Sequence, residues 1–292
     1  MTVLELIDAG ARQLDAAGVS FGHGTRNAFD EAAWLVLWQL GLPLDSALDG
    51  PASIADRSVT QPRQALVTQL FARRIASRQP AAYLTQEAWL QGVPFYVDPR
   101  VIVPRSLIAE LLARGELDYW LPADSRCVLD LCTGGGSLAI LAARAWPGLA
   151  VDAADLSADA LAVAAINLDR HRLVDRVRLL QGDGLAAAQG PYDLILCNPP
   201  YVNDASMESL PPEYRAEPVL ALAGGLDGMD FVRQLVRAAS AHMKADAALV
   251  LEVGNERRHF EAAFAHLAAI WLDTSAGGDA VCVLTRAALM VR

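Results

Sequence analysis

The sequence predicts an α/β protein: a doubly wound, mainly parallel sheet of seven strands, preceded by a small helical domain and a β-hairpin. From Arg126 onward, strand-like apolar runs alternate with helical patterns, which is typical of such a sheet. A glycine-rich turn follows the first of these runs directly. At 292 residues the chain is long for one domain and short for three, so two are expected. The predicted limits are 1–85 for the helical domain, 86–104 for the hairpin linker and 105–292 for the sheet domain.

The first 85 residues are predicted to be helical because their apolar residues recur at helical spacing. One stripe includes Leu4, Ile7 and Leu14, a second helix ends at Gly41, and a third begins at Pro62. The third helix is basic on one side, through Arg63, Arg73, Arg74 and Arg78. These arginines are expected to form a solvated face, and the alternative is a face that docks a partner.

Strand patterns fill the rest of the chain. Residues 93–97 and 100–103 flank an Asp98-Pro99 turn and predict the hairpin. A short helix through Leu112 is expected after it. The strands of the main sheet are predicted at 126–132, 149–154, 176–181, 192–197, 247–253, 269–273 and 280–285. Ligands in such sheets bind beyond the carboxyl ends of the strands, where all the candidate motifs fall.

Composition narrows the function classes. The net charge is 24 minus 34, or −10, which disfavours bare nucleic acid and suits a basic protein partner. The four cysteines form no CxxC pair, so a reduced protein without zinc, other metal or disulfides is expected. No apolar run reaches the roughly eighteen residues of a membrane span. Residues 1–8 carry acids and no basic leader, which predicts a helix rather than a signal peptide. A cytoplasmic location follows as an expectation.

The motif Asn198-Pro199-Pro200-Tyr201, at the end of the apolar run 192–197, predicts methyl transfer to a planar amide or amine nitrogen. Such a nitrogen has its lone pair in resonance, and acceptors for its hydrogens raise its electron density. The Asn198 side-chain oxygen and the Pro199 carbonyl can be those acceptors. Each proline keeps the preceding residue out of the helical region, and Tyr201 offers a flat face to the substrate or to a sulfonium. The plain alternative is a rigid turn with a capping asparagine.

A second set of residues predicts S-adenosylmethionine as the cofactor. The turn Cys132-Thr133-Gly134-Gly135-Gly136 allows the backbone to approach a ligand, as a dinucleotide site also would. Asp130 is placed to attract the methionine ammonium, Asp155 to hold the ribose hydroxyls, and Asp183 to accept from the adenine amino group. A loop or helix-cap role is the alternative for each aspartate. The predicted cofactor-binding residues are Asp130, Cys132, Thr133, Gly134, Gly135, Gly136, Asp155, Asp183, Gly184 and Asn198.

With these motifs the chain resembles the class I S-adenosylmethionine-dependent protein-(glutamine-N5) methyltransferases. The resemblance covers the chain from its N-terminal helices onward and includes 95–105, 129–139, Asp155, Asp183, 198–201, 224–230 and 251–255. Release-factor methyltransferases typically have Pro-Arg-Pro and a glycine at position 132. Here Pro104-Arg105-Ser106, Cys132 and Glu252-Val253-Gly254-Asn255 look like the enzymes that act on large-subunit ribosomal protein uL3. Leu107 departs from that subfamily, in which proline is expected.

The resemblance implies a Rossmann-like methyltransferase sheet and methylation of a glutamine amide in uL3, with S-adenosyl-L-homocysteine as the product. Contact with pre-ribosomal RNA is then expected only through the substrate. The helices of 1–85 would recognise that protein. Three alternatives stay open at this point: a release-factor glutamine methyltransferase, an adenine-N6 nucleic-acid methyltransferase, and a non-catalytic S-adenosylmethionine-binding module in ribosome assembly.

Overall fold

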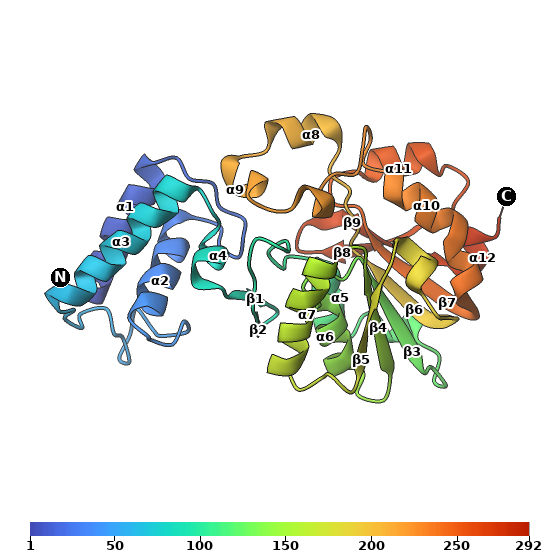
Figure 1. Cartoon of the computed structure of the whole chain (residues 1–292), viewed down its shortest axis with the longest axis horizontal. Coiled ribbons are helices and arrows are strands. Elements are labelled where there is room, and N and C mark those ends of the chain that lie inside the picture. Colours follow the sequence, from blue (N-terminus) through green and yellow to red (C-terminus); the bar gives the residue numbers. More distant parts are fainter. Residues whose placement is uncertain (292) are drawn as a thin grey trace. The chain divides into compact units, whose positions relative to one another are not determined.

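The structure is a computed structural model that describes residues 1–291. Its internal contacts divide the chain into two compact units (Figure 1). The first comprises Met1–Ala88 and a short returning segment, Leu210–Ala216. The second comprises Trp89–Ser209 and the chain from Glu217 onward. Each unit has a hydrophobic core of its own.

The first unit is helical, as the sequence predicts. Its main helices are α1 (Val3–Ala16), α2 (Ala28–Gln39), α3 (Gln61–Ser77) and α4 (Ala81–Thr85). Thr2 and Glu5 form a reciprocal capping box at the start of α1, which satisfies two backbone donors there. A methyl group on Gly10 would lie 2.1 Å from the Phe71 ring, so a glycine at this position lets α1 and α3 pack closely.

The returning segment joins this unit through ionic contacts. It contains the short helix α9 (Pro212–Arg215). Arg74 Nε lies 2.8 Å from Glu31 Oε1, and its Nη1 lies 3.2 Å from Glu213 Oε1. Arg78 Nε lies 2.7 Å from the same Glu213 oxygen. Two arginines of the helical unit, Arg74 and Arg78, thus pair with the buried carboxyl group of Glu213.

The prediction that the arginines of α3 share one exposed face is therefore wrong for Arg74. Arg74 is fully buried because it lies three and four positions after Phe71 and Leu70, on the helix face that packs inward. Arg63 and Arg73 are exposed, and Arg78 is partly buried.

The hairpin lies earlier than predicted. It pairs β1 (Ala88–Leu90) with β2 (Val93–Phe95) around Gln91 and Gly92, whose φ angles are 50° and 72°. Two consecutive positive φ values are those of a type I′ hairpin turn. The predicted pairing of 93–97 with 100–103 is wrong. Asp98 instead accepts hydrogen bonds from the backbone and side chain of Arg100, which closes a local turn without strand pairing.

The second unit contains the predicted seven-stranded sheet. Its strands are β3 (Cys127–Leu131), β4 (Ala150–Asp155), β5 (Val177–Gln181), β6 (Tyr192–Cys197), β7 (Met243–Glu252), β8 (Ile270–Thr274) and β9 (Gly277–Thr285). Their order is β5-β4-β3-β6-β7-β9-β8, and β9 is antiparallel to both of its neighbours. The other pairs are parallel. The doubly wound, mainly parallel sheet is confirmed.

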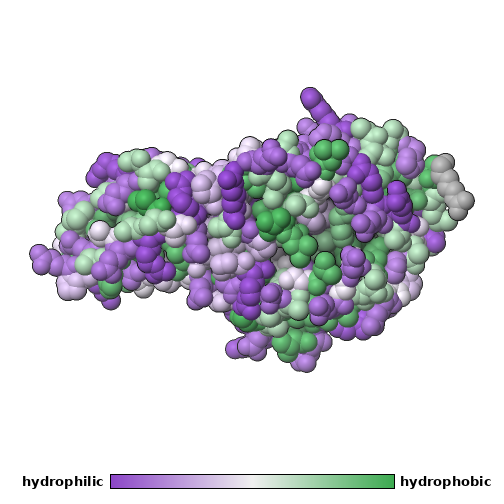
Figure 2. All heavy atoms as spheres, turned by 45° about the horizontal axis from the view of Figure 1, so that its top comes forward, coloured by the Kyte–Doolittle hydropathy of each residue, from purple (hydrophilic) through white to green (hydrophobic). Residues whose placement is uncertain are grey.

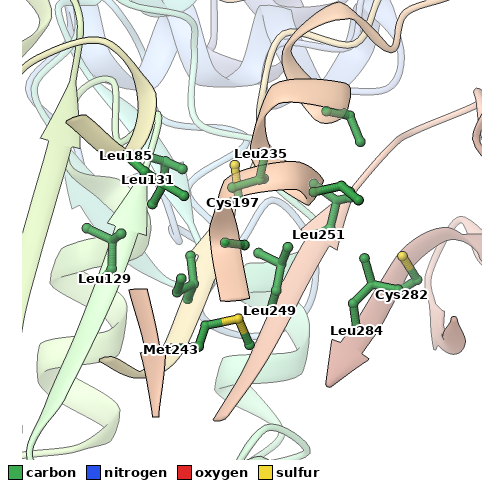
Figure 3. Packing of buried hydrophobic residues seen from close by; sticks show 14 of the residues in the cluster. Leu129, Leu131, Leu185, Cys197, Leu235, Met243, Leu249, Leu251, Cys282 and Leu284 are labelled. Atoms are coloured by element: carbon green, nitrogen blue, oxygen red, sulfur yellow. The ribbon is translucent and has the colours of Figure 1, made fainter. Parts of the chain in front are cut away.

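Helices cover both faces of this sheet (Figure 1). On one face lie α5 (Ile108–Ala113), α6 (Ser137–Ala145) and α7 (Ala158–Arg170), and on the other α10 (Asp230–Ala238) and α11 (Arg257–Ala263). Figure 3 shows the core of the second face, where Leu129, Leu131 and Cys197 pack with Leu249 and Leu251. Alternate residues of each strand point to this face, as strand geometry requires. The remaining short elements are α8 (Asp204–Ser209), α12 (Arg286–Leu289), η1 (Asp118–Trp120), η2 (Gly184–Ala187), η3 (Val219–Ala221) and η4 (Ala239–His242).

The sheet changes winding direction between β3 and β6. The chain passes from β3 to β4 and β5 on one side, and from β6 to β7 on the other. A crevice opens beyond the carboxyl ends of the strands at such a switch point, and it is where doubly wound sheets bind ligands. The register pairs Leu131 with Cys197, so the glycine-rich turn and Asn198 leave the sheet side by side.

Candidate active site

A cavity lies at this switch point, within the second unit. Most of the residues predicted to bind the cofactor line it. The lining includes Cys132, Gly134, Asp155, Asp183, Gly184, Asn198 and Pro200. Asp130, Thr133, Gly135 and Gly136, also predicted, do not line it; nor do Pro199 and Tyr201.

The turn after β3 is built from left-handed backbone. Cys132, Gly134 and Gly136 have φ angles of 60°, 54° and 80°. A Cβ on Gly136 would meet the Ala164 Cβ at 3.2 Å, so this glycine also allows α6 to start close to α7. A Cβ on Gly134 would meet nothing within 4 Å, although its φ disfavours a side chain. Of this turn, Cys132 and Gly134 line the cavity, and Gly134 presents bare backbone to it.

Asp155 fixes this turn from the end of β4. Its Oδ2 accepts from the Gly134 N–H at 2.8 Å and its Oδ1 from the Ser157 N–H at 2.9 Å. An ionised carboxylate has about four acceptor sites, so two backbone bonds leave capacity for ligand hydroxyls. Asp183 directly precedes the short helix η2 and does not cap it through its side chain, so its carboxylate is not used there.

Asp130 lies behind the turn and is buried. Its Oδ2 accepts from the Thr133 hydroxyl and from the Ala139 N–H at the start of α6. Its Oδ1 is buried and has no hydrogen-bond partner among the described residues. Burial raises the pKa of this carboxyl to about 7. An unsatisfied buried acceptor of this kind fits a cationic donor, such as an ammonium group.

Asn198 carries the second unsatisfied acceptor of the site. Its side-chain Oδ1 is buried and has no partner among residues 1–291. Pro199, which follows, is buried, and neither it nor Pro200 has an N–H that could occupy a neighbouring acceptor. A buried amide oxygen without a donor costs free energy unless a ligand supplies one. Asn198 Oδ1 can thus accept a hydrogen bond from an N–H group of a ligand, as the sequence predicts for the substrate amide.

Tyr201 faces a different space from the cofactor residues. Its hydroxyl donates to Glu252 Oε1 at 3.3 Å. With Glu252 it lines a second cavity, of about 910 Å³, that also includes Arg105, Leu107 and Gly254. Tyr201 adjoins Pro200 in the chain, so the tetrapeptide contributes residues to both cavities.

Sequence reasoning did not identify the apolar lining of the first cavity. These residues are Val101, Ile102, Leu156, Pro218, Leu220, Ala221 and Phe231. Leu156 offered a signal in its position directly after Asp155, at the end of a predicted strand, and in the structure it is 49% exposed. Phe231 directly follows the segment 224–230 of the resemblance, whereas Pro218 and Leu220 offered no signal, since they lie in a stretch without a motif. Apolar walls with a few convergent polar groups are what small-molecule sites generally show.

Two further findings bear on function. Throughout residues 1–291, no cluster of three or more His, Cys, Asp or Glu side chains could hold a metal ion. In the same residues no helix combines the length and apolarity needed to cross a membrane. Figure 2 shows hydrophilic residues interspersed with small hydrophobic groups on the face that it presents.

Comparison with known sequences gives a consistent group of relatives. A family profile described as "Methyltransferase small domain" matches residues 112–210. The chain is 53% identical to a ribosomal protein uL3 glutamine methyltransferase of Bordetella pertussis, over 98% of this chain and 95% of that protein. It is 49% identical to a protein of the same name from Burkholderia pseudomallei, over 97% and 94%. A protein of that name from Neisseria meningitidis serogroup B is 43% identical, over 99% and 94%.

Comparison with solved structures concerns the fold. The catalytic domain of human Mettl16, solved in complex with MAT2A 3′UTR hairpin 6, superposes with a TM-score of 0.53. The match covers 82% of this chain and 85% of that chain at 12% identity. At that identity the likeness establishes a shared methyltransferase fold.

Proposed function

The chain belongs to the family of ribosomal protein uL3 glutamine methyltransferases, and on that premise we propose that it methylates the side-chain amide nitrogen of a glutamine in uL3. The methyl donor is S-adenosyl-L-methionine, the cofactor that a class I methyltransferase domain implies. The methyl carbon would leave sulfur as it bonds to the amide nitrogen, so the other products are S-adenosyl-L-homocysteine and one amide proton, which passes to water. Within the family, the subfamily predicted from positions 104–106, 132 and 252–255 is confirmed.

The observation that carries this proposal is the unpartnered Oδ1 of Asn198. A glutamine amide has two N–H donors. One can satisfy Asn198 Oδ1 and the other the Pro199 carbonyl. As the nitrogen gains positive charge in the transition state, both acceptors bind it more strongly, so they lower the barrier as well as orienting the amide. S-adenosylmethionine supplies an electrophilic methyl group on a positively charged sulfur.

The residues around the first cavity fit this cofactor. Asp155 would hold the ribose hydroxyls with the acceptor sites that Gly134 and Ser157 leave free. Asp183 would accept from the adenine amino group, and the unpartnered Oδ1 of Asp130 would attract the methionine ammonium. The turn from Cys132 to Gly136 would cradle the methionine part with its backbone.

The helical unit is proposed to recognise the protein substrate. It contributes no residue to the lining of the cofactor cavity. Because Arg74 and Arg78 are bound to Glu213, the exposed Arg63 and Arg73 are the remaining basic candidates on α3. A ribosomal protein as substrate would place the reaction in the cytoplasm, and contact with RNA would come only through that substrate.

Intact-mass analysis tests the proposal. Purified uL3 and purified release factor are each incubated with the protein and S-adenosylmethionine, and the modified residue is located in a digest. We expect uL3 to gain one methyl group on a glutamine, faster than release factor does. Faster modification of release factor would overturn the choice of substrate. Transfer of labelled methyl groups into nuclease-sensitive material would instead indicate an adenine methyltransferase, and no transfer at all a binding module.

A further inference from the structure

Tyr201 is enclosed by three glycines that belong to two distant loops. A Cβ on Gly254 would lie 2.4 Å from the Tyr201 ring. A Cβ on Gly228 would lie 2.2 Å from the Tyr201 carbonyl oxygen, and one on Gly224 would lie 2.8 Å from its Cα. Any side chain at these positions would displace Tyr201. The backbone after it is also held, because Val202 exchanges hydrogen bonds with the backbone of Leu222 and Gly224, each at 2.8 Å.

One buried carboxylate completes this enclosure. Glu252, the last residue of β7, is 3% exposed. Its Oε1 accepts from the Tyr201 hydroxyl at 3.3 Å. Its Oε2 accepts from the Ser106 hydroxyl at 2.6 Å and from the Leu107 N–H at 2.9 Å. A proline at position 107 would lack that N–H, so Leu107 gives this chain a donor that a proline could not supply.

Glu252 therefore connects two segments that flank the two cavities. One is the Asn198–Tyr201 tetrapeptide. The other is the stretch from Val101 to Leu107, whose beginning lines the first cavity and whose end lines the second. Burial raises the pKa of Glu252, and hydrogen bonds from Ser106, Leu107, Ile108 and Tyr201 counteract this effect. Burial and the adjacent Glu252 also raise the pKa of Tyr201, so its hydroxyl keeps its proton and stays a donor.

On the basis of the proposed function, we propose that Glu252 is a positioning residue for methyl transfer, which holds Tyr201 and through it the amide acceptors at Asn198 and Pro199. Two consecutive prolines leave the tetrapeptide few conformations, so fixing its last side chain fixes the direction of the Pro199 carbonyl. Displacement of the reacting groups by about 1 Å can cost about a hundredfold in rate. Glu252 touches no reacting atom and acts through the Tyr201 hydroxyl.

The chain offers a matched control in Glu217. It is also 3% exposed, and it binds the same flanking stretch through the Val103 N–H at 2.9 Å and both terminal nitrogens of Arg105 at 2.7 Å. Both carboxylates thus support the 101–107 stretch, but the Tyr201 hydroxyl donates to Glu252. A purely structural role would make the two carboxylates equivalent.

The experiment is a pair of double-mutant cycles on the full chain, with kcat and KM for uL3, affinity for S-adenosylmethionine and free energy of unfolding measured for each variant. We expect Glu252→Gln and Tyr201→Phe each to lower kcat about tenfold, with cofactor affinity within about threefold of the wild type. Glutamine can still accept from Ser106 and Leu107 but presents its NH₂ to Tyr201. The double variant should be no slower than either single variant, because both remove the hydrogen bond that the Tyr201 hydroxyl donates to a carboxylate. The Glu217→Gln and Tyr201→Phe effects should multiply.

Two results would overturn the inference. One is that the Glu252→Gln and Tyr201→Phe effects on kcat multiply. The other is that Glu217→Gln is as non-additive with Tyr201→Phe as Glu252→Gln is. If Glu252→Gln does not fold, Tyr201→Phe alone decides, and an unchanged kcat counts against the inference. If the wild-type protein methylates uL3 but the Glu252→Gln and Tyr201→Phe effects multiply, the role of Glu252 is excluded and the proposed function stands. A wild-type protein that methylates neither uL3 nor release factor removes both.

Discussion

Arg74 and Glu213 form an ion pair of 3.2 Å in which neither side chain is exposed, although 139 positions separate them in the chain. The first belongs to helix α3 and the second to the segment that returns to the helical unit soon after the Asn198–Tyr201 tetrapeptide. The helical unit therefore holds part of the loop that begins at the tetrapeptide. Breaking such a pair leaves a buried charge without its partner, which costs more than an exposed pair ever contributes.

We expect Arg74→Ala to lower the free energy of unfolding of the helical unit by about 3–5 kcal/mol, because it leaves the buried Glu31 without its cation and Glu213 with Arg78 alone. Chemical denaturation followed by circular dichroism measures this. The control is Arg73→Ala on the same helix, which is exposed and should change the value by less than about 0.5 kcal/mol. Equal effects of the two substitutions would contradict the buried pair.

The Asp130 carboxyl should make stability depend on pH. Its pKa lies at about 7 in the folded chain against an ordinary value of 3.8, because burial disfavours its charge. Between those two values the folded chain holds a proton that the unfolded chain has lost, so the contribution of this group to the free energy of unfolding falls as pH rises from about 4 to 7. Below this window the contribution is fully present.

Asp130→Asn should remove this slope while leaving the pH dependence of other groups in place. Denaturation midpoints at several pH values, for the wild type and the variant, give the difference directly. A difference between the two proteins that does not change with pH would contradict the raised pKa. Near pH 6, cofactor binding to the wild type should also release protons, as calorimetry in two buffers would show, because an ammonium beside Asp130 favours its ionised form.

Asp155→Ala should weaken S-adenosylmethionine and S-adenosylhomocysteine by a similar factor, since the ribose is common to both. We expect a loss of about tenfold or more, typical of a charge-assisted hydrogen bond. Isothermal titration measures it. Asp159→Ala, an exposed aspartate in the first turn of α7, is the control and should leave both affinities unchanged. A loss for one ligand only would mean that Asp155 senses the methyl group or the charge on sulfur.

Asn198→Ala should lower turnover by about thirtyfold to a thousandfold while cofactor affinity stays within about tenfold. The removed acceptor is worth about 2–4 kcal/mol in the transition state. Equilibrium binding and a methyl-transfer assay on the same preparation separate the two effects. Turnover close to that of the wild type would exclude Asn198 as an acceptor for the amide.

The sheet and the places of its motifs were predictable because buried parallel strands carry a strong local signal. Each of the seven predicted runs overlaps one strand of the sheet, although β7 begins at Met243 and β9 at Gly277, before the predicted 247 and 280, because polar residues open both strands. The hairpin was misplaced because Val101 and Val103 are as apolar as strand residues. They are buried but lie outside the strands of the structure, and the turn at Gln91-Gly92 had only one glycine to indicate it.

Long-range polar contacts were beyond prediction from one sequence. Arginine is usually exposed, and Arg74 lies on a helix with several other arginines. Only its ion pair with Glu213, far along the chain, explains its burial. The role of Glu252 likewise depends on Tyr201 and Ser106, which no spacing relates to it. Local patterns identify the residues that face a ligand, whereas the residues that hold them in place come from tertiary packing.

A truncated chain that begins at Glu87 tests the helical unit as a whole. All the residues that line the cofactor cavity lie between Arg100 and Phe231, so the truncated chain should bind S-adenosylmethionine within about tenfold of the wild type once circular dichroism shows it folded. Methylation of uL3 should fall much further.

The truncation removes a proposed recognition surface, but it also deprives Glu213 of Arg74 and Arg78. Glu213→Ala in the full chain separates these causes, because it loosens the returning segment and keeps the helices. If recognition dominates, Glu213→Ala retains most uL3 activity, and the truncated chain methylates a short glutamine peptide as fast as the full chain does. If anchoring dominates, both proteins are slow on both substrates. Full activity of the folded truncated chain toward uL3 would exclude the helical unit from either role.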